Sequence, residues 1–139
     1  MSFPPIESLI PHRPPQLLVD RVLEQEGARI VTEGTITAEA LPGHFPEMPV
    51  VPGVWMIEGL AQSLAALGAL SGEHGRAVLT GVEKARFRGM ALAPVTLRYE
   101  VEVLDRRFGL TSAKGVVRVG TKTVCTCTLS AAILPAEGP

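Results

Sequence analysis

The sequence predicts an α+β domain in which an antiparallel sheet wraps around one long helix. Two segments of alternating polar and apolar residues come first, one almost wholly apolar helical run follows, and four more alternating segments complete the chain. Alternation is typical of strands with one buried face, and a helix that is apolar on nearly every side must be enclosed by other structure. A sheet packed around that helix satisfies both requirements and leaves one sheet face or edge available to a partner.

Length and composition indicate a single domain over residues 1–139. A hydrophobic content of 46% with 19% charged residues is globular and rather apolar, which suggests surface buried in an oligomer. The net charge of −1 gives no reason to expect nucleic-acid binding. No run of eighteen apolar residues exists, and the N-terminus lacks the regions of a signal peptide. We therefore expect a cytoplasmic protein without membrane insertion.

Before the helix, a short turn and a hairpin are predicted. Residues 6–10 make at most one helical turn, and the proline-rich residues 11–15 must be extended or turning. Residues 16–25 and 29–39 each alternate as strands around a turn at Gly27. His12 lies in the proline-rich stretch, where nothing nearby in the sequence supplies a nucleophile or a second metal ligand. We therefore assign His12 a structural role.

The central helix carries the first candidate catalytic residue. Pro52 suits a first helical position, because its missing N–H would be unpaired there and its φ already matches a helix. Over residues 54–70 the polar side chains are Glu58, Gln62 and Ser63. Desolvation in such surroundings favours a protonated carboxyl, so Glu58 is a candidate general acid. Gln62 follows at the i,i+4 spacing, where helix side chains meet, and could orient that carboxyl.

A histidine stands on the turn before this helix. Residues 43–53 read GHFPEMPVVPG, and His44 precedes Glu58 by fourteen positions. Histidine changes protonation near neutral pH and is the natural base. The free N–H groups at the helix start, around Gly53 and Val54, could hold a developing oxyanion. Singly, a loop histidine or a glutamate in an apolar helix is more often structural, but together they indicate an acid–base site.

The remainder of the chain reads as four strands. Residues 71–75 end the helix, and strands are predicted over residues 77–88, 96–105, 109–119 and 122–134. Cys125 and Cys127 alternate along the last of these and read as small buried side chains in a reduced compartment. Lys84, Arg86 and Arg88 form the one basic cluster, and a period of two would put all three on one strand face, which is either merely solvated or meets an anion.

At these residues the chain resembles the bacterial β-hydroxyacyl-[acyl-carrier-protein] dehydratases of type II fatty acid synthesis, which have the hot-dog fold. The segments similar to the active-site signature of that family are Gly43-His44-Phe45-Pro46, Pro49, Pro52-Gly53 and Glu58 to Gln62. Residues 9–14 and 17–22 are similar to its opening segment, and residues 81–88 to its third-strand segment. The order of the motifs and the spacing from histidine to glutamate are the same, and the resemblance extends over most of the chain.

The resemblance implies a reaction and a role for each residue. The Gly53 N–H would bind the carbonyl of a (3R)-hydroxyacyl thioester, and His44 would remove the α-proton while the Val50 carbonyl holds its other ring nitrogen. Glu58 would protonate or hydrogen-bond the departing hydroxyl, directly or through a water, to leave a trans-2-enoyl thioester and water. No metal or cofactor is needed.

The resemblance also implies partners. In the family the histidine and the acid come from different subunits, so a homodimer would be the smallest active unit, and dimers could assemble further into a hexamer. Lys84, Arg86 and Arg88 would be a docking patch for an acidic acyl carrier protein and the phosphate of its phosphopantetheine arm. Such charge complementarity mainly raises the association rate.

Two departures and two rival functions stay open at this point. Glu47 and Trp55 differ from the residues usual in the family and leave acyl chain length and carrier preference undecided. A hot-dog acyl thioesterase could use the same helix start with Glu58 activating water, and would not need His44. A non-catalytic acyl-binding paralogue would need neither residue.

Overall fold

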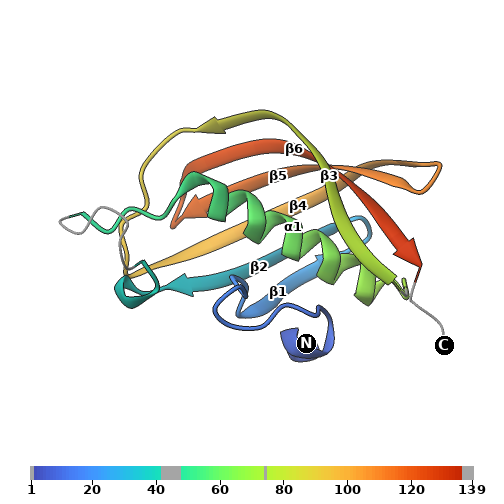
Figure 1. Ribbon diagram of the computed structural model, residues 1–139, viewed down its shortest axis with the longest axis horizontal. Helices are drawn as coiled ribbons and strands as arrows, with labels where there is room; N and C mark the ends of the chain where they lie inside the picture. Colours follow the sequence, from blue (N-terminus) through green and yellow to red (C-terminus); the bar gives the residue numbers. More distant parts are fainter. Residues whose placement is uncertain (1, 42–47, 74, 136–139) are drawn as a thin grey trace.

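The computed structural model describes residues 2–41, 48–73 and 75–135, and in this part of the chain a six-stranded antiparallel sheet carries one long helix on one face (Figure 1). The α+β prediction is therefore confirmed. The elements in chain order are the 3₁₀ turn Ile6–Ser8, β1 Arg21–Glu26, β2 Arg29–Ile36, the 3₁₀ turn Ala38–Ala40, α1 Gly53–Leu70, β3 Gly75–Phe87, β4 Val95–Arg107, β5 Leu110–Val119 and β6 Lys122–Pro135.

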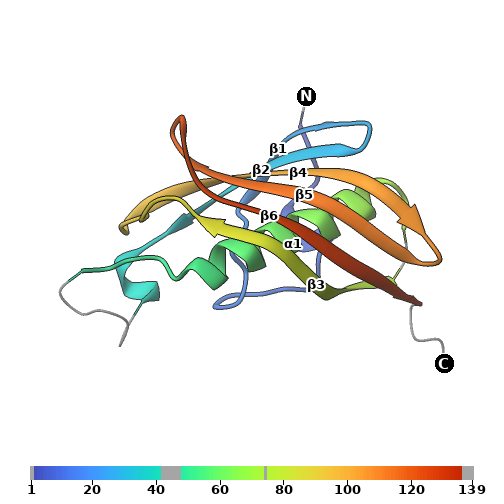
Figure 2. The same ribbon diagram turned by 90° about the horizontal axis from the view of Figure 1, so that it is seen from above.

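The strands follow the order β1-β2-β4-β5-β6-β3 across the sheet. The first two form the predicted hairpin, and Gly27 in its turn has a φ of 56°, which glycine adopts without steric cost. The strand that follows the helix, β3, pairs with β6 and so lies at the opposite edge from β1. Figure 2 shows α1 running along one face of the sheet, with the edges β1 and β3 without a further strand in the described chain.

The helix begins one residue later than the proline suggested. Pro52 is the N-cap, with a ψ of 137°, and Gly53 is the first helical residue. The prediction that Pro52 occupies the first helical position is therefore wrong by one residue. The Val51 N–H donates to the Ala91 carbonyl at 2.8 Å, which holds the chain extended up to the start of the helix.

Two glycines let α1 approach the sheet closely. A Cβ on Gly59 would lie 2.2 Å from the ring of Tyr99 on β4, and one on Gly115 of β5 would lie 2.7 Å from the side chain of Leu60. Real Cβ atoms do not approach other atoms so closely, so the aromatic ring and the leucine fill the space that side chains would need. The distance between helix and sheet is therefore set at these two positions.

A buried pair of hydroxyls adds a polar contact between helix and sheet. Thr32 Oγ1 on β2 lies 2.8 Å from Ser63 Oγ on α1, and Ser63 Oγ donates to the Gly59 carbonyl at 2.8 Å. Both side chains are fully buried, and each finds a partner, as buried hydroxyls must. The contact fixes the rotation of α1 about its own axis.

Within one chain the enclosure predicted for α1 exists on one side only. By length and composition the helix could cross a membrane, but half of it is buried in the protein core, as in a core helix. The side that faces away from the sheet remains open, because Val54 is 68% exposed and Trp55, Ile57 and Glu58 are half-buried. An exposed apolar side of this kind, as seen in the described residues, is typical of a surface that packs against a partner.

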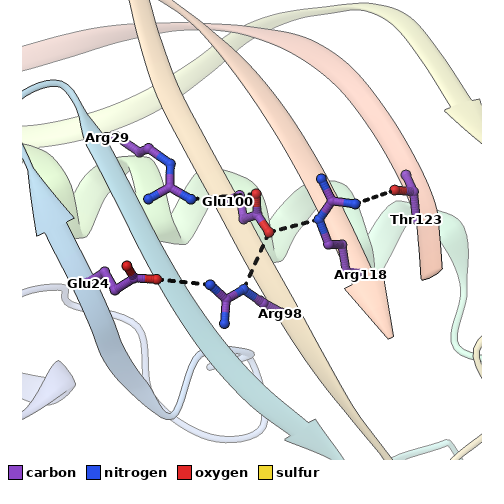
Figure 3. A network of polar contacts seen from close by, with 6 residues as sticks. All are labelled: Glu24, Arg29, Arg98, Glu100, Arg118 and Thr123. Atoms are coloured by element: carbon purple, nitrogen blue, oxygen red, sulfur yellow. Dashed lines mark hydrogen bonds and ion pairs between the residues drawn. The ribbon is translucent and has the colours of Figure 1, made fainter. Parts of the chain in front are cut away.

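The face of the sheet that points away from α1 carries an ion-pair network (Figure 3). Its members are Glu24, Arg29, Arg98, Glu100, Arg118 and Thr123. Glu100 is central, with a side chain only 18% exposed, and accepts from Arg118 Nε at 2.9 Å and Arg98 Nε at 3.3 Å. Because the members come from five strands, the network ties β1, β2, β4, β5 and β6 together across the outer face.

The two cysteines are free and buried, as the alternation on β6 predicted. Burial raises the pKa of Cys125 and of Cys127 to about 11, so both stay protonated at neutral pH. They are packing residues and not nucleophiles.

We expect Gly59→Ala to lower the free energy of unfolding by about 2–3 kcal/mol, because the new methyl group collides with the Tyr99 ring. Gly81→Ala is the control, since a Cβ there meets nothing closer than 3.8 Å. Thermal and urea unfolding measure both. Adding Tyr99→Leu to Gly59→Ala should cost less than the two single changes summed, and strict additivity would contradict the collision.

Candidate active site

The carboxyl of Glu58 is held by the amide of Gln62 on the next turn of α1. Gln62 Nε2 donates to Glu58 Oε2 at 2.8 Å, as the i,i+4 spacing predicted. Gln62 is fully buried, whereas the Glu58 side chain is 43% exposed in the single chain. The burial expected for Glu58 is thus not provided by its own chain.

Every hydrogen-bonding group of the Gln62 amide is used. Its second N–H donates to the Gln16 carbonyl at 2.8 Å, and its oxygen accepts from the Leu18 N–H at 2.9 Å. An amide has two donors on one side and an acceptor on the other, so this set of partners permits one orientation only. The residues before β1 are thereby tied to α1, and the N–H that faces Glu58 cannot rotate away.

Tyr99 of β4 also holds the segment before β1. Its hydroxyl donates to the Leu18 carbonyl at 3.2 Å. Burial, with smaller contributions from the carboxylates of Asp20 and Glu58, raises the pKa of Tyr99 far above its ordinary value. The phenol therefore stays protonated at neutral pH and remains a hydrogen-bond donor to the Leu18 carbonyl.

The structure also brings His12 to this site, which the sequence reasoning did not foresee. His12 Nε2 lies 3.7 Å from Glu58 Oε2. We assigned His12 a structural role because its neighbours in the sequence offer no chemical partner, but its partner comes from α1, far along the chain. The one signal that pointed to it was its position in the opening motif that resembles the dehydratases.

At the start of α1, free N–H groups adjoin an apolar groove. Within the described chain, the N–H groups of Gly53 and Val54 have no backbone acceptor. The Phe87 ring packs against Gly53, where a Cβ would lie 2.6 Å from it. The groove has a volume of about 430 Å³, and its lining includes Val50, Met56, Phe87 and Met90. Donors beside an apolar groove suit a carbonyl attached to a hydrocarbon chain.

His44, the predicted base, lies outside the described residues. Its predicted approach to the Val50 carbonyl and its distance from Glu58 therefore remain predictions. The structure brings together Glu58 and Gln62, and the same helix presents the Gly53 N–H.

The three basic residues do not follow the regular alternation on which we relied. The pairing of β3 with β6 shifts register between Glu83 and Arg86, and Lys84 has a φ of 54°. One extra residue on β3 interrupts the period of two, and β3 ends at Phe87, before Arg88. The prediction that a strand period puts all three on one face is wrong, although all three side chains are exposed.

Among the residues that the structure describes, no three His, Cys, Asp or Glu side chains gather as metal ligands would. The Glu58 carboxyl has an amide and an imidazole as its neighbours, which is a set suited to holding or moving a proton. The chemistry that these side chains support is acid–base chemistry.

Comparison with known proteins assigns the chain to a family. Residues 10–128 match the FabA-like domain. The chain belongs to the FabA-like family. The 3-hydroxyacyl-[acyl-carrier-protein] dehydratase FabZ of Desulforamulus reducens is 42% identical over 92% of this chain and 94% of its own length. The FabZ protein of Pseudothermotoga lettingae is 36% identical over 93% of this chain and 94% of its own. The resemblance to the dehydratases is thus confirmed over nearly the whole chain.

Solved structures confirm the hot-dog fold of this FabA-like chain. The dehydratase heterocomplex ApeI:P from Xenorhabdus doucetiae superposes with a TM-score of 0.81 at 16% identity, covering 95% of this chain and 92% of that one. The uncharacterized protein PH1136 from Pyrococcus horikoshii gives 0.73 at 14% identity, covering 97% and 98%. At such identities the likeness shows the shared fold alone.

We expect Gln62→Met to lower the free energy of unfolding by about 1–3 kcal/mol, because the buried Leu18 N–H loses its acceptor and the Gln16 carbonyl loses its donor. Gln25→Met is the control, since the amide of Gln25 bonds the Gly27 carbonyl at an exposed position. Urea unfolding compares the two. Equal stability of both variants would show that the Gln62 amide does not hold the N-terminal segment.

Proposed function

We propose that this protein is a 3-hydroxyacyl-[acyl-carrier-protein] dehydratase, which converts a (3R)-hydroxyacyl thioester into the trans-2-enoyl thioester and water in fatty acid or related acyl-chain biosynthesis. The observation that carries the proposal is the Glu58 carboxyl fixed by Gln62 on a helix whose start offers free N–H groups. Relatives of that name share 36 to 42% of their residues with this chain over 86 to 94% of its length. That likeness supports the same reaction.

In the first part of the reaction, the Gly53 N–H donates to the thioester carbonyl oxygen. Negative charge collects on this oxygen as the α-proton leaves, and a donor aimed at it from the start of α1 stabilises that charge. His44 takes the α-proton, and the Val50 carbonyl holds the other ring nitrogen so that the accepting nitrogen faces the substrate. The acyl chain occupies the apolar groove beside Gly53.

In the second part, Glu58 donates a proton to the β-hydroxyl. The bond between the β-carbon and oxygen breaks, the electron pair left at the α-carbon forms the double bond, and water departs. His44 ends with one proton more and Glu58 with one fewer, and exchange with solvent restores both. Gln62 keeps the carboxyl in place during the transfer, since its amide cannot turn.

The partner that presents the substrate is an acyl carrier protein with a phosphopantetheine arm. Lys84, Arg86 and Arg88 are exposed at and beyond the end of β3, next to Phe87, which lines the apolar groove. Cations at the mouth of the groove suit the arm's phosphate and an acidic carrier, and their contribution weakens with salt. The interruption at Lys84 spreads the three charges around the strand end instead of aligning them.

A second copy of the chain covers the open side of α1 and the edge of β3. The edge strand exposes Val78, Leu79 and Val82, and Glu58 is half-open in a single chain. A homodimer would bury these groups, and one subunit's histidine would face the other's acid. Assembly of dimers into a hexamer and a cytoplasmic location complete the proposal. The protonated, buried thiols of Cys125 and Cys127 support a reducing location.

We expect Glu58→Gln and His44→Ala each to lower kcat for dehydration at least a hundredfold, because each removes one of the two proton-transfer groups. Incubation with 3-hydroxyacyl carrier protein, followed by mass spectrometry for loss of water, measures the rate. Glu39→Gln is the control for Glu58→Gln, since Glu39 is exposed on the 3₁₀ turn Ala38–Ala40. Release of free acid and free thiol by the wild type would instead identify a thioesterase, and an unchanged cellular phenotype of both variants would leave acyl binding as the function.

We expect a Val78→Lys, Val82→Lys double variant to dissociate into monomers and to lose dehydratase activity with the dimer, because two charges would face the partner's edge strand. A Leu104→Lys variant is the control, since Leu104 is exposed on β4, and β5 and β6 lie between β4 and that edge. Light scattering across a concentration series reports the mass. A monomeric, fully active wild type would contradict the dimer.

A further inference from the structure

Two nitrogen atoms converge on one oxygen of the Glu58 carboxyl. Gln62 Nε2 donates to Oε2 at 2.8 Å, and His12 Nε2 lies 3.7 Å from the same Oε2. Within the described chain, Oε1 has no hydrogen-bond or ion-pair partner. The two oxygens of this carboxyl are therefore not equivalent, and Oε1 is the one left for a substrate.

The backbone around His12 is fixed before any substrate binds. The Arg13 guanidinium donates to three carbonyls of the same segment, those of Glu7, Ile10 and His12, at 2.8, 2.9 and 2.6 Å. The Gln62 amide then ties the end of this segment to α1 through the Gln16 carbonyl. The backbones of His12 and Glu58 are thus held in relation to each other by bonds that do not involve either side chain.

The surroundings of the ring indicate which nitrogen carries the proton. His12 Nδ1 is buried and has no partner within the described chain. A proton on Nδ1 would be a donor without an acceptor, which disfavours the Nδ1–H tautomer. Nε2 faces a carboxyl oxygen, and a lone pair at Nε2 would be repelled by the lone pairs of Oε2. The tautomer with its proton on Nε2 satisfies both conditions.

The charged groups nearest to the far side of the ring do not change this conclusion. Beyond His12 lies a hollow of about 240 Å³, bordered by Pro11, Ala65 and the side chains of Glu73 and Arg76. Glu73 is already paired with Arg106, so it is not the partner of His12. Glu58 remains the direct partner of the imidazole.

We propose that His12 is a positioning residue for Glu58, which rests on the dehydratase function proposed above. As the second donor to Oε2, alongside Gln62, His12 directs the acidic proton onto Oε1 and aims it at the β-hydroxyl. The gap of 3.7 Å closes when substrate fills the site, as catalytic hydrogen bonds often tighten in the substrate complex.

The test compares His12→Phe with His12→Gln. Phenylalanine keeps the ring shape without a donor, whereas the Gln amide puts an N–H near the position of His Nε2. We expect His12→Phe to lower kcat about tenfold to hundredfold with KM changed less than about twofold, and His12→Gln to recover most of kcat. Equal losses in both variants, or a loss confined to KM, would overturn the proposal.

A double variant separates an action through Glu58 from an independent one. In the Glu58→Gln background, His12→Phe should cause no further loss, which single-turnover mass spectrometry can resolve at low rates. A further loss equal to that in the wild type would show that His12 acts on its own and would overturn the positioning role.

A readout without turnover distinguishes failure of this inference from failure of the proposed function. If the wild type dehydrates no 3-hydroxyacyl thioester, the proposed function fails, but NMR still tests His12. The ¹⁵N spectrum should show the Nε2–H tautomer, and the ¹³C carboxyl resonance of Glu58 should shift in His12→Phe while staying near wild type in His12→Gln. An Nδ1–H tautomer, or a Glu58 resonance unmoved by His12→Phe, would overturn the inference.

Discussion

The buried amide of Gln62 joins parts of the molecule that the backbone leaves apart. It forms two hydrogen bonds with the segment before β1, to the Gln16 carbonyl and from the Leu18 N–H. Its second N–H donates to Glu58. Without it, the buried Leu18 N–H would lack a partner, at a cost of about 1–3 kcal/mol, and the Gln16 carbonyl would lose its donor. The stability of the N-terminal segment and the direction of the candidate acid therefore depend on the same side chain. Any change at Gln62 affects both.

The position of α1, which carries this amide, depends on the sheet. Contacts on both faces of the sheet keep it rigid. On the inner face, the Tyr99 ring packs directly against Gly59 of the helix. The helix therefore cannot slide along the sheet without a steric clash. On the outer face, Glu100 pairs with an arginine on each neighbouring strand, Arg29 of β2 at 3.8 Å and Arg118 of β5 at 2.9 Å. Although single surface ion pairs contribute little, a connected and partly buried network resists shear between strands. A carboxyl on a helix supported in this way is held before substrate arrives, which is the condition for efficient proton transfer.

The sequence predicted the parts of this molecule that depend on local pattern, and it failed where distant segments meet. Helix and strand periods located six strands and the helix, and the i,i+4 rule alone paired Glu58 with Gln62. The bulge at Lys84 was not predicted, because a register shift depends on the facing strand. The alternation along one strand carries no information about that partner. His12 escaped for a related reason, since its partner lies on another element and only the folded chain brings them together. Pro52 was misplaced by one residue because a hydrogen bond to a distant loop keeps it extended.

The irregular edge strand β3 affects how readily other extended chains can add to the sheet at high protein concentration. A straight edge strand is a template for any extended peptide and invites open-ended growth into fibrils. Strand β3 shifts register twice against its neighbour, between Leu79 and Gly81 and again between Glu83 and Arg86. Such irregularities interrupt the regular row of backbone groups that an added strand would need along the whole edge. The edge is thus poorly suited to open-ended stacking, although it exposes the apolar side chains of Val78, Leu79 and Val82.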